Sequence, residues 1–382
     1  MHSLERVARD KLSELESARL RRATVPTARG PGAVVQRGGR RLVSFSCNDS
    51  LGLSQHPAVK RAAAAALREH GTGAGASRLI SGNHPLYADL EERLARFEGT
   101  EAALVFGSGY LANLGTIPAL IGPQDLFLAD ELSHACVHGG GRQSRAVQRR
   151  FRHNDPADCE RLLREERPRQ RRCLIATDAV FSMDGDCAPL GELAELARSH
   201  DAWLLADDAH GLGLLGGGRE SARPGPGVDL LIGTLSKALG GYGGFVCASQ
   251  AVVELLVNRA RTLIYSTALP PATLAGAAAA LDIVTSDPDL RRRPLARARL
   301  FAEELGLPPP RSAIVPLILG DAGAALEASE ALAEGGFLVV AIRPPTVPAG
   351  TARLRLSFSA DHSEDDVRAL ARAVELLDLT PR

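Results

Sequence analysis

Short apolar stretches of strand length recur along the first two thirds of the chain. They cover residues 102–106, 126–129, 173–177, 202–206, 230–233 and 244–248, and almost every position in them is hydrophobic. Continuous apolar runs of this length are typical of strands buried on both faces. Between them, hydrophobic positions recur at helical spacing, as in 111–120, 158–166 and 190–200. The alternation predicts an α/β fold with a mostly parallel sheet.

The pattern changes after the pair Pro270 and Pro271. An Ala-rich helix is expected over 273–286, and an Arg-rich helix follows through residue 305. Further on, the sequence predicts strands at 314–319, 337–342 and 352–359, with helices at 324–334 and 364–377. We therefore expect three parts, which are an N-terminal helix and arm (1–48), a large domain (49–272) and a smaller C-terminal α/β domain (273–382) packed with the arm. The Gly- and Pro-rich tract 216–227 is expected to be a surface loop.

Composition narrows the class of protein. The 45 basic and 45 acidic residues cancel, which argues against a general nucleic-acid or membrane-surface binder. The six cysteines are dispersed and form no CxxC pair, so we expect a reducing compartment and no metal site. The first 22 residues carry charges throughout and predict an amphipathic helix rather than a secretory segment. Together these features predict a cytoplasmic protein.

Lysine is scarce in this chain. Lys11, Lys60 and Lys237 are the three lysines among the 45 basic residues, and all the others are arginine. Arginine cannot supply a nucleophilic amine, so a lysine in an apolar, Gly-rich stretch suggests a chemical role. Lys237 is in such a stretch, where desolvation favours Schiff-base chemistry. The alternative, a surface lysine, fits its apolar neighbours less well.

Four predicted strands end in unusual polar residues. Ligands bind beyond the carboxyl ends of parallel strands, so these residues are expected to meet at one sheet edge. They supply helix-start amides, a carboxylate, an imidazole and an amine, which are the groups that pyridoxal phosphate (PLP) requires. The residues are Gly109, Tyr110, Ser182, Asp207, His210, Thr234 and Lys237. Taken singly, Asp207 is also compatible with a helix cap, and the isolated patterns at His210 and His134 favour structural or exposed histidines. Gly107-x-Gly109-x-x-Ala112, with Asp130 downstream, also fits a dinucleotide fingerprint, so a nicotinamide-dependent dehydrogenase is an alternative, as is a non-catalytic binding module.

Longer stretches carry a resemblance to one family. Residues 45–53, 133–135, 177–186, 207–211 and 234–237, together with 263–267 and 341–355, resemble the α-oxoamine synthases, which are PLP-dependent enzymes of fold type I. The similarity runs almost from end to end and lies nearest the member that acts in biotin biosynthesis. It implies a fold type I transferase that condenses L-alanine with a pimeloyl thioester, carried by coenzyme A or an acyl-carrier protein, with loss of carbon dioxide. Members that join glycine to acetyl-CoA or succinyl-CoA, or serine to palmitoyl-CoA, are the alternatives within the family.

The resemblance also assigns roles to single residues. Lys237 would hold PLP as a Schiff base, Asp207 would pair with the pyridine nitrogen, His210 would contact the ring oxygen and His134 would stack on the ring. Gly109, Tyr110, Ser182 and Thr234 would bind PLP as well. Substrate-contacting positions would be Arg21, Asn48, His134, Arg343 and Thr346.

The family further implies a homodimer with its sites at the interface, in which Ser266 or Thr267 serves the cofactor of the partner. Two positions depart from the family pattern. Asp178 stands where glutamate is usual, and Ser50 stands where tyrosine is usual. Both departures concern substrate positioning rather than the PLP set.

Overall fold

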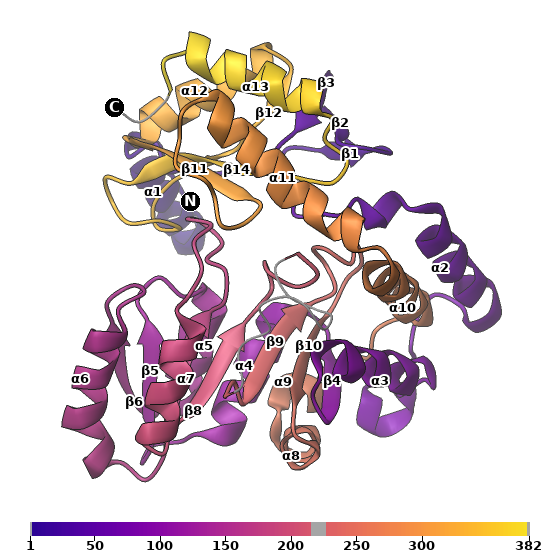
Figure 1. The fold of residues 1–382 in the computed structure, drawn as a ribbon, viewed down its shortest axis with the longest axis vertical. Helices are drawn as coiled ribbons and strands as arrows, with labels where there is room; N and C mark the ends of the chain where they lie inside the picture. The colour runs from indigo at the N-terminus through magenta and orange to yellow at the C-terminus, as the bar shows by residue number, and fades with distance from the viewer. Residues whose placement is uncertain (1, 215–226, 380–382) are drawn as a thin grey trace. The chain divides into compact units, whose positions relative to one another are not determined.

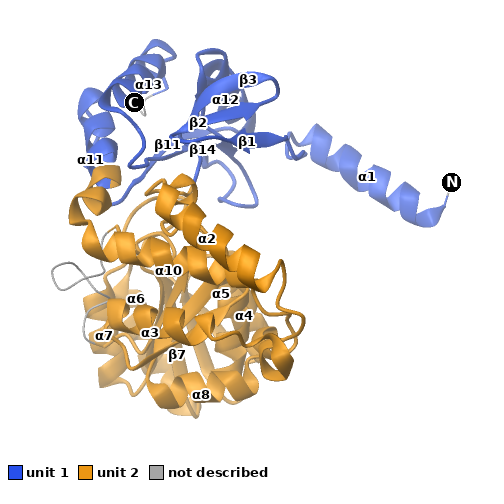
Figure 2. Cartoon of the chain, turned by 90° about the vertical axis from the view of Figure 1, so that its right-hand side faces the viewer, with its two compact units in different colours: residues 1–47, 295–382 blue, residues 48–294 orange. Residues whose placement is uncertain are grey.

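The computed structural model describes residues 2–214 and 227–379, so most of the expected surface loop 216–227 lies outside the described residues. The chain divides into two compact units (Figure 2). Unit 1 comprises residues 1–47 and 295–382, and unit 2 comprises residues 48–294. Residues 273–294, which the sequence interpretation assigned to the C-terminal domain, belong to unit 2.

Unit 2 is built on a seven-stranded sheet with the order β4-β10-β9-β8-β7-β5-β6 (Figure 1). The strands are β4 (Ala102–Phe106), β5 (Leu126–Asp130), β6 (Val147–Phe151), β7 (Cys173–Asp178), β8 (Trp203–Asp207), β9 (Leu230–Thr234) and β10 (Gly244–Ala248). The pairs β5–β6, β5–β7, β7–β8 and β8–β9 are parallel, whereas β10 is antiparallel to both neighbours. The predicted α/β fold with a mostly parallel sheet is confirmed.

Helices cover both faces of this sheet. The structure has α2 (Pro57–His70), α3 (Leu86–Glu98), α4 (Gly109–Leu120), α5 (Ala135–Ser144), α6 (Pro156–Glu166), α7 (Leu190–Ser199), α8 (Gln250–Arg259), α9 (Arg261–Ile264) and α10 (Pro271–Ser286), followed by α11 (Pro288–Glu304), within which the unit boundary falls. Helices α4, α5, α8 and α9 bury side chains on one face. On the other face lie α2, α3 and α10 toward one edge, and α6 and α7 toward the other.

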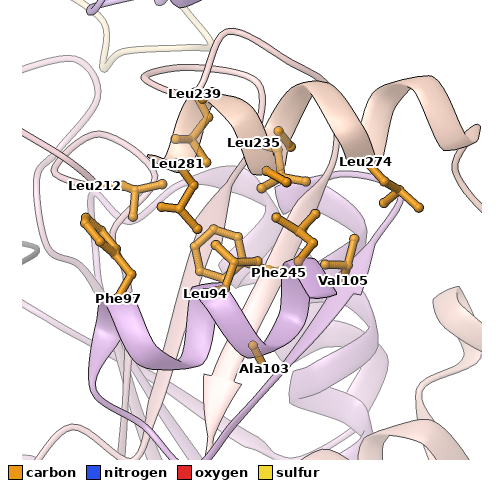
Figure 3. Close-up of a cluster of buried hydrophobic side chains, with 14 of the residues drawn as sticks. Leu94, Phe97, Ala103, Val105, Leu212, Leu235, Leu239, Phe245, Leu274 and Leu281 are labelled. Carbon is orange, nitrogen blue, oxygen red and sulfur yellow. The ribbon is translucent and has the colours of Figure 1, made fainter. Parts of the chain in front are cut away.

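Strand β4 shows why the apolar runs are continuous. All five of its residues are buried. Ala103 and Val105 point to the cluster with α3 and α10, whereas Leu104 and Phe106 point to the cluster with α4. Figure 3 shows part of the first cluster, in which Phe245 of β10 is fully buried. Alternate side chains therefore enter two different cores, and neither set can be polar.

Unit 1 holds two smaller sheets. One has the order β1-β2-β3-β12 and the other β11-β14-β13. The strands are β1 (Thr27–Arg29), β2 (Val34–Arg37), β3 (Arg40–Ser44), β11 (Ile314–Gly320), β12 (Phe337–Leu338), β13 (Ala341–Ile342) and β14 (Ala352–Ser357); the helices are α1 (Ser3–Ser17), α12 (Ala322–Glu334) and α13 (Glu364–Leu376). Helix α1 has no buried residue and stands apart from both sheets (Figure 2).

The sequence prediction of one strand over 337–342 was wrong. The segment is divided between the two sheets, because Phe337 and Leu338 pair with β3 whereas Ala341 and Ile342 pair with β14. Between the two pairs, Val340 N donates to Ser46 Oγ at 2.8 Å and Ser329 Oγ donates to the carbonyl oxygen of Val339 at 2.6 Å. These side-chain bonds replace ladder bonds where the chain changes sheets.

The described part of the chain has no helix that is both long and apolar enough to cross a membrane.

Candidate active site

The predicted cofactor residues line one cavity at the carboxyl edge of the unit 2 sheet. It has a volume of about 220 Å³. Every predicted PLP-binding residue of unit 2 except Thr267 lines it, namely Gly109, Tyr110, His134, Ser182, Asp207, His210, Thr234 and Lys237. The other lining residues are Ser108, Cys136, Asp178, Val180, Ala209 and Ser236.

Lys237 presents its amine to this cavity. It follows β9, between buried Leu235 and Ala238, and the residue itself is half-buried. Its Nζ lies 2.8 Å from Nε2 of His210. The amine therefore lies beside an imidazole at the edge of the sheet, in a buried stretch of the chain. The prediction that Lys237 faces the crevice rather than bulk solvent agrees with this geometry.

Asp207, at the end of β8, is a buried carboxylate with fixed hydrogen bonds. Its Oδ2 accepts from Asn113 Nδ2 at 2.7 Å, and its Oδ1 accepts from the backbone N–H of Ala209 at 3.0 Å. Asn113 is fully buried on α4, and sequence reasoning missed it. The available signal was a single amide among the apolar positions of that helix, and only the fold shows that it faces Asp207.

The start of α4 forms the end of the cavity that suits a phosphate. Ser108 caps the helix by accepting from Leu111 N at 3.1 Å, so the following amides and the positive end of the helix dipole remain available to an anion. Thr234 Oγ1 donates to the carbonyl oxygen of Gly243 at 2.9 Å and lies 2.8 Å from Ser236 Oγ. A Cβ at Gly244 would come within 2.2 Å of Gly109 N, so glycine there lets the backbone segments meet.

His134 caps α5 with its ring, and its Nδ1 accepts from the backbone N–H of Cys136 at 3.3 Å. The same nitrogen lies 2.7 Å from Cys136 Sγ. Burial lowers the pKa of His134, with a smaller opposing effect from Asp207 and a further lowering from Lys237. The ring is therefore neutral at neutral pH, and its planar face suits stacking on a cofactor.

Asp178, the departure from the family pattern, supports His134. It is buried at the end of β7, and its Oδ1 accepts from the backbone N–H of His134 at 3.0 Å. Burial raises the pKa of Asp178 well above its usual range, and the charge of Asp207 raises it further. The shorter side chain thus reaches the backbone that carries the stacking residue.

The predicted substrate residues Arg21, Arg343 and Thr346 lie together in unit 1. Arg343 Nη2 donates to the carbonyl oxygen of Arg21 at 3.4 Å, and Arg22 Nη2 donates to Thr346 Oγ1 at 3.3 Å. Burial lowers the pKa of Arg343, and the charge of Arg22 adds to this. Arg21, Arg22 and Arg343 line a cavity of about 530 Å³, together with Arg37 and Arg40.

The two remaining predicted site residues lie in unit 2, outside the 220 Å³ cavity. Asn48 is exposed, and its carbonyl oxygen accepts from Ser50 N at 2.9 Å. Thr267 is also exposed and forms an isolated antiparallel bridge with Ser77.

The residues present fit PLP. One cavity offers an amine, a buried carboxylate, a neutral ring and a capped helix start. These are the groups that the aldehyde, the ring nitrogen, the ring face and the phosphate of PLP require. Gly244 has no Cβ, so its backbone can lie against the backbone of Gly109 at the start of α4.

Comparison with known proteins gives the same assignment. The family model described as aminotransferase class I and II matches residues 40–374. The 8-amino-7-oxononanoate synthase of Methylobacterium radiotolerans is 58% identical over 377 residues, which cover 99% of each chain. That of Methylocella silvestris is 59% identical over 342 residues, which cover 89% of this chain and 98% of the relative.

Solved structures extend the comparison. A serine palmitoyltransferase from S. paucimobilis with bound PLP superimposes with a TM-score of 0.91 at 29% identity, covering 99% of this chain and 100% of the other. The 8-amino-7-oxononanoate synthase of Francisella tularensis gives a TM-score of 0.74 at 27% identity, covering 88% of this chain and 98% of the other.

Fold and site together define a PLP-dependent transferase of fold type I. The predicted family, cofactor and class of enzyme are confirmed. The chain belongs to the class I and II aminotransferase family, in which its near full-length relatives bear the name 8-amino-7-oxononanoate synthase.

Proposed function

We propose that this chain condenses L-alanine with a pimeloyl thioester, with Lys237 holding the cofactor and moving the proton. One bond forms between alanine Cα and the thioester carbonyl carbon, the thiol departs, and the alanine carboxylate leaves as carbon dioxide. The product is 8-amino-7-oxononanoate, an intermediate of biotin biosynthesis. The observation that carries the proposal is the amine of Lys237 beside His210, in a cavity that Asp207 also lines. The chain is 58% identical to a relative named 8-amino-7-oxononanoate synthase.

PLP, when bound, supplies an electron sink for the pair of electrons left at alanine Cα. Lys237 removes the Cα proton and returns one after decarboxylation. His210 Nε2, 2.8 Å from Nζ, keeps that amine directed into the cavity between the two transfers. General acid–base catalysis of this kind depends on such a fixed distance.

With PLP bound, Asp207 would hold the pyridine nitrogen and favour its protonated form. It can do so because its carboxylate is already oriented: Asn113 donates to one oxygen and the Ala209 amide donates to the other. A buried carboxylate with two fixed donors cannot rotate away when the ring nitrogen arrives. Asn113 is therefore a positioning residue for Asp207.

His134 stacks on the ring and excludes water from that face. Burial lowers the pKa of His134, so its ring is neutral at neutral pH. Asp178 holds the His134 backbone, the amides of Gly109 and Tyr110 suit the phosphate, and Thr234 lines the same cavity.

Unit 1 carries further proposed substrate contacts. Arg21, Arg343 and Thr346, joined by Arg22, suit anionic groups of the substrates, because guanidinium groups pair with phosphate and with carboxylate. The resemblance implies that Asn48 and Arg343 contact the amino-acid carboxylate. Arg355 of β14, which sequence reasoning did not single out, is a buried arginine of unit 1; it donates to Ser357 Oγ at 2.6 Å, and burial lowers its pKa to about 10.

We further propose that the enzyme is a cytoplasmic homodimer with the alanine, the thioester and a second copy of the chain as its partners. Thr267 supports this, because its exposed side chain lies outside the cavity of its own unit and is available to a partner. Among the described residues, the six cysteines form no disulfide.

The test compares Lys237→Ala with Lys60→Ala. Lys60 is an exposed lysine on α2 of the same unit, with its Nζ 3.4 Å from Gln55 Oε1. Each protein is mixed with PLP, L-alanine and either pimeloyl-CoA or pimeloyl-acyl-carrier protein, and free thiol and 8-amino-7-oxononanoate are measured.

We expect Lys60→Ala to match the wild type, and Lys237→Ala to bind PLP non-covalently while forming no product. Turnover by Lys237→Ala would refute the role of the amine. Product from glycine or serine but not from alanine would move the chain to another α-oxoamine synthase reaction. The ratio of kcat/KM values for the two donors identifies the carrier.

A further inference from the structure

A second charged cluster lies beside the cofactor cavity. His153, which follows β6, places its ring between two carboxylates. Its Nδ1 lies 3.0 Å from Asp130 Oδ1, and its Nε2 lies 2.8 Å from Asp186 Oδ2. Asp130 is fully buried at the end of β5. Neither carboxylate contributes to the cavity, and the proposed reaction does not use them.

Each aspartate belongs to a different cofactor loop, which Asp130 organises through its carboxylate and its backbone, and Asp186 through its backbone. Asp130 Oδ1 accepts from Leu132 N at 2.9 Å, and its backbone carbonyl accepts from Ser133 N at 3.1 Å, which forms the turn that ends at His134. Asp186 closes the other loop, because its carbonyl oxygen accepts from Phe181 N at 3.0 Å. That closed loop carries Ser182.

Asn154 doubles the link between these loops. Its backbone N–H donates to Asp130 Oδ2 at 2.8 Å, and its Nδ2 donates to Asp186 Oδ2 at 2.6 Å. The His153 ring also meets Phe181 edge-on, with ring centroids 4.4 Å apart. The end of β5, the residues after β6 and the 181–186 loop are thus joined at one imidazole.

The charge of this imidazole follows from its surroundings. Burial lowers the pKa of His153, but the hydrogen bonds and charges of Asp130 and Asp186 outweigh it and raise the pKa to about 10. Both ring nitrogens therefore donate. A neutral ring could donate to one carboxylate only and would leave the other facing a lone pair.

We propose that His153 is a positioning residue for the cofactor, because its ring ties Asp130 to Asp186 and thereby sets the distance between the His134 turn and the Ser182 loop. The proposal rests on the proposed PLP-binding roles of His134 and Ser182. A displacement of either loop moves the His134 ring or the Ser182 hydroxyl relative to the cofactor, so the effect appears in PLP affinity.

The experiment measures the dissociation constant of PLP for the full chain, by absorbance titration, and the melting temperature without PLP. The variants are His153→Gln and Asp186→Asn; the second keeps the His153–Asp130 pair and guards against loss of folding in the first. The matched control is Arg171→Gln. Arg171 pairs with fully buried Asp125 through two bonds of 3.0 Å just before β5, at the end of the strand opposite to Asp130.

We expect PLP to bind on the order of tenfold more weakly to His153→Gln and Asp186→Asn, and unchanged to Arg171→Gln at a similar loss of melting temperature. The proposal is overturned if the dissociation constant of PLP rises less than fivefold in both His153→Gln and Asp186→Asn. It is also overturned if Arg171→Gln raises that constant as much as these two variants do.

A double-mutant cycle separates positioning from general loosening. Adding His153→Gln to Ser182→Ala should weaken PLP binding less than it does in the wild type, because the residue through which it acts is gone. Fully additive effects overturn the proposal. If His134→Ala and Ser182→Ala each leave PLP affinity unchanged, the proposed cofactor site fails rather than the role of His153.

Discussion

His362 should make unit 1 sensitive to acid. Its ring is buried and stacks on Phe45, with ring centroids 3.9 Å apart and planes inclined by 9°. Nδ1 accepts from Ser359 N at 2.8 Å, and Nε2 lies 3.0 Å from the carbonyl oxygen of Ser44, to which it donates. Both nitrogens are thus satisfied in the neutral ring, and a proton on Nδ1 would break the bond from Ser359.

The magnitude follows from the two protonation states. Burial lowers the pKa of His362 to about 4, against a small opposing effect of the bond to Ser44, whereas the unfolded chain has the ordinary value of about 6.5. The folded pKa is depressed, so the unfolded state binds the proton first as the pH falls. The stability that neutral His362 contributes to the folded state is fully present above pH 6.5 and is lost progressively as the pH falls toward 4. The loss is roughly 1 kcal/mol at pH 5.5 and roughly 2 to 3 kcal/mol at pH 4.5.

The assay is denaturant unfolding of the wild type and His362→Asn at pH 7.5, 5.5 and 4.5. We expect the variant to be less stable at pH 7.5, and the difference in unfolding free energy to shrink by roughly 2 to 3 kcal/mol by pH 4.5. His70→Asn, at an exposed histidine of unit 2, is the control and should follow the wild type. A difference between wild type and His362→Asn that stays constant with pH would refute the reasoning.

Three further predictions concern unit 2. Gly244→Ala should weaken PLP binding by about tenfold, because a Cβ 2.2 Å from Gly109 N displaces the start of α4, whereas Gly276→Ala, whose Cβ would make ordinary contacts from 3.6 Å, should leave PLP titrations unchanged. Asn113→Ala should lower the unfolding free energy of the PLP-free chain by about 1.5–3 kcal/mol, because it removes the donor to the buried Asp207 carboxylate; unchanged denaturant midpoints would contradict this. Leu94→Ala, fully buried in the cluster of Figure 3, should cost about 2–5 kcal/mol in the same unfolding assay, and a loss below 1 kcal/mol would show that the cluster repacks.

Local pattern was sufficient for most of the sheet of unit 2. The six apolar runs became β4, β5, β7, β8, β9 and β10 with ends shifted by at most one residue. A strand buried on both faces must be apolar at every position, which makes such runs visible without knowledge of their partners. Strand β6 escaped detection because it lies at the sheet edge, and three of its five residues are exposed.

Pairing was beyond the sequence. The antiparallel direction of β10 and the division of 337–342 between two sheets depend on which distant strand lies alongside. Side-chain periodicity defines the faces of a strand, but its neighbours are chosen by the whole chain.

The same distinction holds for the site. Lys237 and Asp207 could be predicted because each follows a recognisable strand, and the carboxyl ends of parallel strands meet at one edge whatever the details of the fold. Asn113 and His153 could not, because an amide on an apolar helix and a histidine after an edge strand acquire meaning only from the carboxylates that folding brings within hydrogen-bond distance. The sequence thus determined which chemical groups the sheet edge holds, and the tertiary structure decided which residues keep them in place, because hydrogen-bond partners far apart in the chain leave no periodic signal.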